Sequence, residues 1–380
     1  MINPEGKELL KEDSFEFQQI KTLVEDTYQL GTLNKVYEIF GGYVNRSFGV
    51  EMTKADGEPI DYFVRKYRTT ATDEDIKVEH SLVTYAIEKG MDVAAGVIPL
   101  PSGKTFTKVE EEVDGKTEVY PFAIYRYLYG DDTYDWINTN MKPEEDYNFG
   151  ALQAKFHNFT NGFNPGEKAE PQIYDFLKVK KEHFVHCPDG LPIPERDRYI
   201  ILYKSALDEV LAYCDKARNG LKDSGMLDKA PKTPCHCDYH PGNVKWQDGK
   251  CIGIFDFDWS KLDYRLFDIC FGLAYTVSAW EAMQDGTLHL DRVKTYLQGY
   301  NDYLKKDGTL TPFIDEEVKA FPYMMLAADI YLFNWATDYF NFWEDYNEFE
   351  WYYYLAHIMR LMHFIDEHAK DLEEIIASVR

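Results

Sequence analysis

Acidic and amide side chains recur at short spacing in the middle of the chain. Residues 236–243 read HCDYHPGN, and Asp256 follows within the segment IFDF. Asn243 lies five residues after Asp238, and Asp256 lies eighteen residues after it. Carboxylate and amide oxygens are the hard ligands that Mg²⁺ prefers, and another carboxylate can orient an attacking hydroxyl. Residues of these types are typical of phosphoryl transfer, which depends on metal ligands and alignment more than on covalent catalysis.

A β-hairpin is the element that would bring these residues together. The short apolar arms NVKW and CIGIFDF flank the turn Gln247-Asp248-Gly249, a pattern typical of a hairpin. Asp258, in FDFDW, is an alternative metal ligand to Asp256, because alternation along a strand puts both side chains on the same face. A chance grouping of carboxylates in an acidic chain is the alternative interpretation.

A zinc site is another alternative for this segment, with Cys235, His236, Cys237 and His240 as ligands. Adjacent Cys-His-Cys side chains point in different directions. No second ligand pair follows at the spacing of structural zinc sites. We therefore favour the phosphoryl-transfer interpretation over zinc.

Composition excludes several classes of function. The chain has 380 residues, 45% apolar, with a net charge of −25, and a nucleic-acid partner would require a basic surface instead. No apolar run reaches the roughly 18 residues of a membrane span, and the N-terminal residues carry charges where a secretory signal would be apolar. Six cysteines form no disulfide framework. We expect a soluble, cytoplasmic protein with reduced thiols, no nucleic-acid or membrane partner and no sequence signal for an oligomeric state.

Strands dominate the first third of the sequence. Residues 32–67 alternate between apolar and polar positions and are interrupted by turns, which predicts consecutive antiparallel strands. Residues 72–90 predict an amphipathic helix with Ile76, Val83 and Ile87 on one face. Residues 105–130 predict a hairpin that turns at Asp114-Gly115.

Helical spacing dominates from Asp131 onward, in residues 145–160, 196–217, 290–306 and 316–370. Residues 188–197 predict a proline-rich loop. We therefore predict two domains, 1–126 and 127–380, joined by a short extended connection.

The segment that contains these acidic residues resembles the aminoglycoside phosphotransferase and choline kinase superfamily, which includes type II homoserine kinases and N-acetylhexosamine kinases. The family motif is a histidine, one residue, an aspartate, four residues and an asparagine, then a hairpin and a second aspartate. The resemblance implies an α+β, protein-kinase-like two-lobed fold with an antiparallel-sheet N-lobe and a mainly helical C-lobe. It implies Asp238 as catalytic base, Asn243 and Asp256 as Mg²⁺ ligands, and His236 as a support of the loop. Asp268 corresponds to a structural aspartate of the family.

The N-terminal half resembles the nucleotide-binding lobe of the same family. Gly42 and Asn45 fall in a glycine turn that the resemblance places near the phosphates, although a plain hairpin turn fits the residues equally well. Tyr127 and Leu128 fall in a segment that resembles the hinge beside the adenine. The residues do not distinguish ATP from GTP as the nucleotide. His157 lies in a helix that the family also has, and we interpret it as a packing residue.

A basic residue on the strand FVRKY pairs, in the family, with a glutamate on the inserted helix. The resemblance favours Arg65 with Glu79. Lys66 is the alternative, because alternation lets only one of the two adjacent basic side chains face the nucleotide. The alternative interpretation is that Arg65 and Lys66 are both solvated charges at the edge of a strand, without a role in nucleotide binding.

The acceptor is the least defined part of the prediction. Aromatic and acidic side chains gather between residues 331 and 361, and carboxylates beside aromatic rings suit a cation, although aromatics at helical spacing are more often core. The residues concerned are Trp335, Asp338, Trp343, Glu344, Asp345 and Glu348. We predict an ATP- and Mg²⁺-dependent phosphotransferase acting on the hydroxyl of a small, cationic molecule such as an amino sugar, aminoglycoside, amino alcohol or homoserine. A non-catalytic nucleotide-binding protein and a protein kinase are the rival functions.

Overall fold

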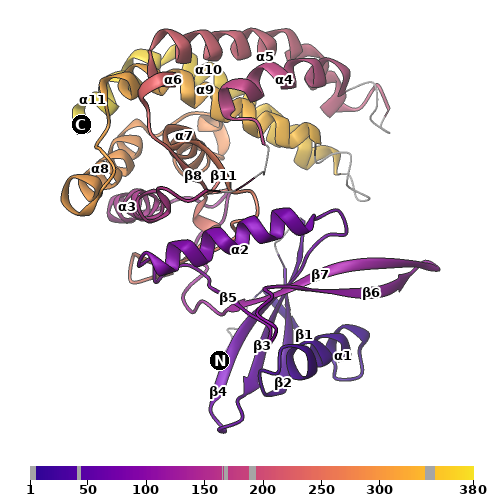
Figure 1. The fold of residues 1–380 in the computed structure, drawn as a ribbon. Coiled ribbons are helices and arrows are strands. Elements are labelled where there is room, and N and C mark those ends of the chain that lie inside the picture. Colours follow the sequence, from indigo (N-terminus) through magenta and orange to yellow (C-terminus); the bar gives the residue numbers. More distant parts are fainter. Residues whose placement is uncertain (1–5, 41–43, 165, 167–169, 188–193, 339–346) are drawn as a thin grey trace. The chain divides into compact units, whose positions relative to one another are not determined.

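The computed structural model describes residues 6–380 except 41–43, 165, 167–169, 188–193 and 339–346 (Figure 1). Gly42, most of the predicted proline-rich loop, and Trp343, Glu344 and Asp345 therefore lie outside the described residues. Packing groups residues 1–131 with Ile252–Asp258 in a first compact unit, and Asp132–Cys251 with Trp259–Arg380 in a second. The division predicted between residues 126 and 127 stays a prediction.

An antiparallel sheet forms the centre of the first unit. The order along the sheet is β1-β2-β3-β4-β7-β5, and β6 also pairs with β7. All of these pairings are antiparallel, as predicted. The strands are β1 (Lys7–Leu9), β2 (Thr32–Ile39), β3 (Arg46–Thr53), β4 (Pro59–Lys66), β5 (Val97–Ile98), β6 (Thr107–Val113) and β7 (Lys116–Arg126).

Each face of this sheet is covered by different segments (Figure 1). Helix α1 (Phe15–Lys21) and the π-helical turn η1 (Thr22–Thr27) pack on the face that carries Val64 and Ile124. Helix α2 (Asp73–Glu88) packs Ile76 against Ala123 and Tyr125 on the other face. Because neighbouring strand residues point to opposite faces, Arg65, next to Val64, points to the side of α2.

The inserted helix differs in one detail from the predicted face. Thr72 caps α2 by accepting a hydrogen bond from the backbone N–H of Asp75, and Ile76 and Val83 are buried. Ile87 was expected beside them, but it is 36% exposed. It lies in the last turn of the helix, two residues before the C-cap at Lys89. The apolar stripe is therefore longer than the surface that buries it.

Both predicted hairpin turns have the backbone that their residue types favour. Asp114 and Gly115 have φ values of 51° and 74°, and Asp248 and Gly249 have values of 50° and 71°. Two successive positive φ angles are typical of a type I′ turn, for which Asp-Gly is a preferred pair. The second turn joins β9 (Val244–Gln247) to β10 (Lys250–Ile254), which form a two-stranded sheet.

Helices make up most of the second unit, which confirms the predicted α+β fold class with its mainly helical C-terminal part. Two short strands, β8 (Lys232–Cys235) and β11 (Lys261–Tyr264), pair antiparallel within it. Among the described residues, no helix is both long and apolar enough to cross a membrane. The helices are α3 (Pro143–Thr160), α4 (Ile173–His186), α5 (Arg198–Asp223), α6 (Met226–Lys229), α7 (Arg265–Thr276), α8 (Leu290–Asp307), α9 (Asp315–Asp338), α10 (Glu348–Glu367) and α11 (Ala369–Val379).

Candidate active site

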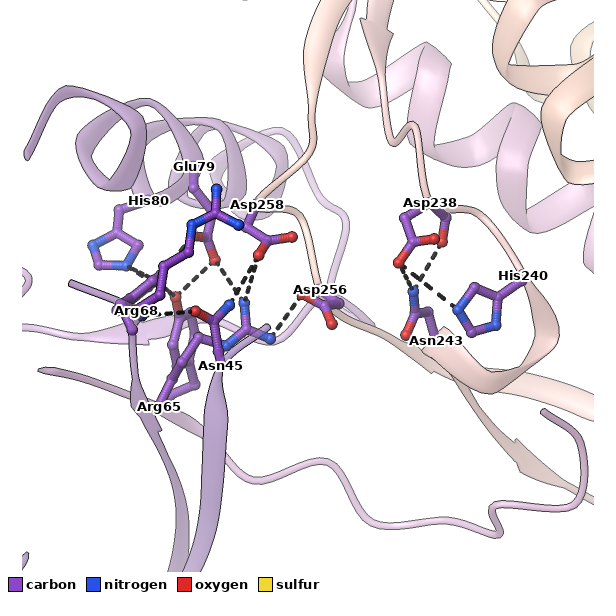
Figure 2. Close-up of polar contacts among 12 residues, drawn as sticks. Asn45, Arg65, Arg68, Glu79, His80, Asp238, His240, Asn243, Asp256 and Asp258 are labelled. Carbon is purple, nitrogen blue, oxygen red and sulfur yellow. Dashed lines mark hydrogen bonds and ion pairs between the residues drawn. The ribbon is translucent and has the colours of Figure 1, made fainter. Parts of the chain in front are cut away.

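Arg65 is buried and lies at the centre of a charged group in the first unit (Figure 2). Its guanidinium Nη2 lies 2.8 Å from Asp256 Oδ1, and Nη1 lies 3.7 Å from Glu79 Oε1 and 4.0 Å from Asp258 Oδ2. Burial disfavours the charged guanidinium, but the charges of Asp256, Glu79 and Asp258 outweigh it and hold the pKa of Arg65 well above its ordinary value. Arg65 is therefore a permanent cation. With Asn45 we call these residues the nucleotide-side group.

Glu79 is fixed by two tyrosines that sequence reasoning did not identify. The hydroxyls of Tyr67 and Tyr125 donate to its two carboxylate oxygens at 2.8 and 2.7 Å. His80 Nε2 lies 2.9 Å from the Tyr125 hydroxyl, and burial lowers the pKa of His80. Two hydroxyl donors and a neighbouring guanidinium hold the Glu79 carboxylate in one orientation. The signal in the sequence is that Tyr67 and Tyr125 follow the alternation of Arg65 and Ala123 on paired strands.

Asp256 and Asp258 do not share a strand face, contrary to the expectation from alternation. Strand β10 ends at Ile254, and Asp256 has φ of 68°, in the left-handed region. Ile254 is held beside the end of α2, where its N–H donates to the carbonyl of Val93 and its carbonyl accepts from the N–H of Ala95, both at 3.0 Å. The backbone thus turns after Ile254, and both carboxylates reach Arg65 from a loop.

Lys66 points away from the nucleotide-side group. Its Nζ is 2.5 Å from Glu111 Oε1 and lies 4.0 Å from the centroid of the Tyr120 ring. Both charged groups of this pair are buried, so neither Arg65 nor Lys66 is a solvated strand edge. Alternation along β4 therefore separates the two adjacent basic residues, as the sequence required.

Asn45, Tyr127 and Leu128 complete the predicted nucleotide contacts that the structure describes. The Asn45 side chain donates to Asp258 Oδ2 at 3.0 Å and accepts from the backbone N–H of Arg68 at 3.1 Å. Asn45 is thus joined to the nucleotide-side group. Tyr127 and Leu128 follow β7, half-buried, and the Tyr127 hydroxyl accepts from Lys7 Nζ at 3.1 Å.

The second unit contains the loop with Asp238, which follows β8 and which we call the catalytic loop (residues 236–243). Asn243 Nδ2 donates to the Asp238 carboxylate at 2.9 Å and to its backbone carbonyl at 2.8 Å (Figure 2). His240 Nε2 lies 3.8 Å from the same carboxylate, and the Asp238 side chain is 26% exposed. Asp238 is therefore held in one orientation yet accessible to an acceptor.

Buried polar contacts hold the catalytic loop from the interior of the second unit. Cys237 has φ of 61°, and its N–H donates to Asp268 Oδ1 at 2.8 Å. His157 Nε2 lies 2.9 Å from Asp268 Oδ2. Burial raises the pKa of Asp268, but the hydrogen bond and charge of His157 outweigh it and lower that pKa. His236 is buried and packs its ring against Phe156, 6.1 Å between centroids.

The donor chemistry of the two units fits Mg²⁺ rather than zinc. Because the Asn243 nitrogen donates to Asp238, its amide oxygen is the atom that can bind a metal, and Asp256 offers carboxylate oxygens. The four residues of the alternative zinc site do not converge. Among the described residues, the only histidine, cysteine and carboxylate group with convergent ligand atoms is His157, Cys235 and Asp268. There, both His157 nitrogens are already bonded, to Tyr300 and to Asp268. All six cysteines are free of disulfides.

Aromatic side chains lie next to the catalytic loop within the second unit. The His240 ring is 5.7 Å from that of Tyr275, and Trp136 makes edge contacts with Tyr275, Trp280 and Tyr354 at 6.4, 5.4 and 6.0 Å. A Cβ added to Gly242 would lie 3.2 Å from the backbone of Asp135, so the loop with Trp136 packs directly on the catalytic loop. We call Trp136, Tyr275, Trp280 and Tyr354 the aromatic group. Of these, Tyr354 lies within the aromatic stretch 331–361 noted in the sequence, whereas Trp136, Tyr275 and Trp280 were not identified there.

Two of the residues expected near the acceptor have contacts in the described part of the chain, and their role stays a prediction. The carboxylate of Glu348 accepts from the backbone N–H of Arg198, at the start of α5, at 3.2 Å. Trp335 is half-buried, with its ring 5.3 Å from that of Trp259. Asp329, which sequence reasoning missed, is fully buried in α9. A carboxylate inside the apolar run MMLAADIYLF was the available signal.

Comparison with known proteins places the chain in a family. The model of the Phosphotransferase enzyme family (APH) matches residues 36–304. The chain belongs to this family, which confirms the resemblance predicted from the sequence. A homoserine kinase of Parvibaculum lavamentivorans is 23% identical over 296 residues, 78% of each chain. The match to a homoserine kinase of Gluconacetobacter diazotrophicus, 31% identical over 101 residues, spans only 27% of this chain and 28% of that relative's length.

Solved structures share the fold at low identity. A microcompartment-associated aminopropanol kinase has a TM-score of 0.62 at 12% identity, with 94% of this chain and 98% of that chain covered. Spectinomycin phosphotransferase APH(9)-Ia, in complex with ADP and spectinomycin, has a TM-score of 0.59 at 13% identity, with 92% and 98% covered. These likenesses support the protein-kinase-like architecture predicted from the sequence.

Proposed function

We propose that this protein is an ATP- and Mg²⁺-dependent phosphotransferase that phosphorylates a hydroxyl group of a small molecule. The observation that carries the proposal is the catalytic loop, where Asn243 holds an accessible Asp238 carboxylate in one orientation. An oriented carboxylate beside an amide oxygen donor is what hydroxyl alignment and metal binding require. An ATP-dependent reaction also fits the cytoplasmic location predicted from the sequence.

The residues of each unit have distinct roles in this proposal. Asp238 accepts the hydrogen bond of the acceptor hydroxyl and takes its proton as the phosphoryl group is transferred. Asn243 and Asp256 supply oxygen ligands to Mg²⁺, which neutralises phosphate charge when bound. Arg65, oriented by Glu79, binds phosphate oxygens of the nucleotide through a permanent positive charge. Asp268, His157 and His236 keep the catalytic loop in place and touch no reactant.

An acceptor with an amino group is the substrate class that we propose. The relatives and structural neighbours include enzymes named for homoserine and aminopropanol. Both molecules carry a primary amine and a hydroxyl. A preference for a cation also suits the chain's net charge of −25, since an acidic protein attracts cationic ligands.

The test is an acceptor screen in which ADP release is measured with ATP, or GTP, and Mg²⁺. The panel contains homoserine, aminopropanol, ethanolamine, choline, glucosamine and an aminoglycoside, with a generic protein substrate as comparison. We expect acceptor-dependent ADP release, with a phosphorylated product identified by mass spectrometry, for at least one amino-containing acceptor. ATP binding without transfer to any acceptor would favour the rival function, a kinase-like binding protein.

A further inference from the structure

Arg65 keeps hydrogen-bond donors without an acceptor, although it is buried. Its side chain is 6% exposed, and its Nε and Nη1 have no hydrogen-bond partner among the residues that the structure describes. A buried donor without an acceptor is costly for a folded protein. Glu79 Oε1 lies 3.7 Å from Nη1, which exceeds the length of a hydrogen bond. The two opposite charges therefore face each other without bonding directly.

The hydroxyls of Tyr67 and Tyr125 explain why Glu79 does not close this gap. Each of them donates to one carboxylate oxygen, Tyr67 to Oε2 and Tyr125 to Oε1. The Tyr125 hydroxyl thus occupies the oxygen that faces Arg65. Both tyrosine rings also lie 5.8 Å from the guanidinium carbon Cζ. The two tyrosines therefore lie beside the cation with their rings and bond the anion with their hydroxyls.

His80 holds the two hydroxyls in this direction. The hydroxyl oxygens lie 2.5 Å apart, and His80 Nε2 faces both, 3.1 Å from Tyr67 and 2.9 Å from Tyr125. Because both hydroxyl protons are directed to Glu79, Nε2 carries the proton that lies between His80 and the hydroxyl oxygens. His80 Nδ1 then accepts from Thr105 Oγ1, 2.8 Å away. A neutral His80 thus has no acceptor left for a tyrosine proton.

The nucleotide-side group is exposed to solvent at Asp256. The Asp256 side chain is 31% exposed and lies 2.8 Å from Arg65 Nη2, whereas Glu79, Tyr67 and Tyr125 are buried. A phosphate group that replaces Asp256 would therefore meet the donors of Nε and Nη1 as well. Phosphate oxygens accept such donors in pairs, because the guanidinium fork matches their geometry.

We propose that the hydroxyls of the two tyrosines hold Glu79 out of hydrogen-bond reach of Arg65 and so keep Nε and Nη1 available for phosphate oxygens of the nucleotide. Tyr67 and Tyr125 are thus positioning residues, which act through Glu79 and touch no reactant. Glu79 compensates the charge of Arg65 without using its donors. The inference rests on the proposed function, in which Arg65 binds the phosphate oxygens.

The test compares Tyr125→Phe, Tyr67→Phe and the double variant with the parent. Phenylalanine keeps each ring in place and removes only the hydroxyl. Tyr28→Phe is the matched control, because Tyr28 is buried on the other face of the same sheet, where its hydroxyl donates to the carbonyl of Phe122 at 3.4 Å. Calorimetry with Mg²⁺ and a non-hydrolysable ATP analogue gives Kd without any acceptor, and Tm is recorded for every variant.

Tyr125→Phe should raise Kd by about fivefold or more, because Glu79 Oε1 loses its donor and bonds Arg65 Nη1 in competition with the phosphates. Tyr67→Phe should raise it by about threefold or less, because this variant frees Oε2 instead of Oε1. The double variant should approach the roughly tenfold loss that removal of one charge-assisted hydrogen bond gives. Tyr28→Phe should stay within about twofold of the parent, because Tyr28 shares no partner with Glu79.

A second comparison separates positioning from stability. In the Glu79→Gln background, Tyr125→Phe should add less than about twofold to Kd, because no carboxylate remains to bond Arg65. In the parent background, the bond to Arg65 satisfies the oxygen that Tyr125→Phe frees. Tm of Tyr125→Phe should therefore stay within about 2 °C of that of Tyr28→Phe.

The inference is overturned if Tyr125→Phe binds the analogue as tightly as Tyr28→Phe, or if its loss of affinity is the same in the Glu79→Gln background. A joint fall of affinity and Tm in the tyrosine variants would also overturn it, because the hydroxyls would then only stabilise the fold. In each of these cases the parent binds nucleotide, so the proposed function stands. A parent that binds no nucleotide would instead reject the proposed function, and this inference with it.

Discussion

Buried charge is compensated at Arg65 in the first unit and uncompensated at Asp329 in the second. Arg65 has Glu79, Asp256 and Asp258 within 4.0 Å, whereas Asp329 has no partner among the residues that the structure describes. A compensated group can form without its ligand and then exchange one partner for another. An uncompensated buried carboxylate instead has its pKa raised by burial, which favours the neutral form. The difference teaches that the neighbours of a buried charge, more than burial alone, decide whether the charged form is favoured.

Exchange of partners has a specific meaning for Arg65. Its shortest contact, 2.8 Å, is to Asp256, the proposed metal ligand. In the absence of nucleotide the two groups neutralise each other. A bound Mg²⁺–nucleotide would supply a cation for Asp256 and an anion for Arg65, so both groups keep an opposite charge. Glu79 remains with Arg65 in both states, because the hydroxyls of Tyr67 and Tyr125 fix it.

The largest effect should come from Asp238→Asn, which removes the acceptor of the hydroxyl proton and keeps the shape of the side chain. We expect kcat to fall by about 10³-fold or more, with the ATP affinity within a few-fold of the parent, because nucleotide contacts lie elsewhere. Single-turnover transfer and calorimetry with a non-hydrolysable ATP analogue would measure the two. Turnover close to the parent's would contradict the role of Asp238 as the group that accepts the hydroxyl proton.

The extent to which the sequence predicted this arrangement differs between the two sites. The catalytic loop follows from a motif of fixed spacing and an Asp-Gly turn. The Arg65–Glu79 pair was predicted from the resemblance to the family, while the alternation of a strand showed only that one of two adjacent basic residues could face the nucleotide. The turn after Ile254 does not, because the φ of 68° at Asp256 depends on backbone hydrogen bonds to residues 93–95, far away in the sequence. The prediction that Asp256 and Asp258 share one strand face was therefore wrong.

The aromatic group was beyond local reasoning for a similar reason. Trp136, Tyr275, Trp280 and Tyr354 come from two loops and two helices that are distant in sequence, and only tertiary packing brings their rings together. The acidic residues chosen from the sequence were conspicuous because they stand close together among aromatic residues. Asp329 stands in an apolar run and was passed over, although an isolated charge among buried neighbours is the stronger indication of function.

An intermediate effect should come from the metal ligands. Asp256→Ala and Asn243→Ala should each weaken Mg²⁺-dependent nucleotide binding by about 100-fold or more, since ligand removal should exceed the 10–100-fold effect typical of outer contacts. Asp258→Ala should weaken it by about tenfold or less, because Asp258 lies 4.0 Å from Arg65 and is bonded to Asn45. Calorimetry during a titration of Mg²⁺ at a fixed nucleotide concentration would rank the three variants by their loss of nucleotide binding. A larger effect for Asp258 would make Asp258 the metal ligand instead.

The smallest and most selective effect should separate Arg65 from Lys66. Each is a buried cation on β4 with a glutamate partner, Glu79 for Arg65 and Glu111 for Lys66. Replacing either by alanine leaves a buried glutamate without its cation, so both variants should unfold at lower temperature. The two substitutions are thus matched in their cost to the fold. Only Arg65 belongs to the nucleotide-side group.

We therefore expect Arg65→Ala to raise the KM for ATP by about tenfold, the loss of one charge-assisted hydrogen bond, while Lys66→Ala leaves it within about twofold. Both KM values are measured below the unfolding range of the less stable variant, with Tm recorded for each. Arg65→Lys should recover part of the affinity, because the charge remains while the two-pronged geometry is lost. Equal KM changes in both alanine variants would show that they act through stability alone. Arg65 would then be a structural cation, and the exchange of partners between Asp256 and the nucleotide would have no basis.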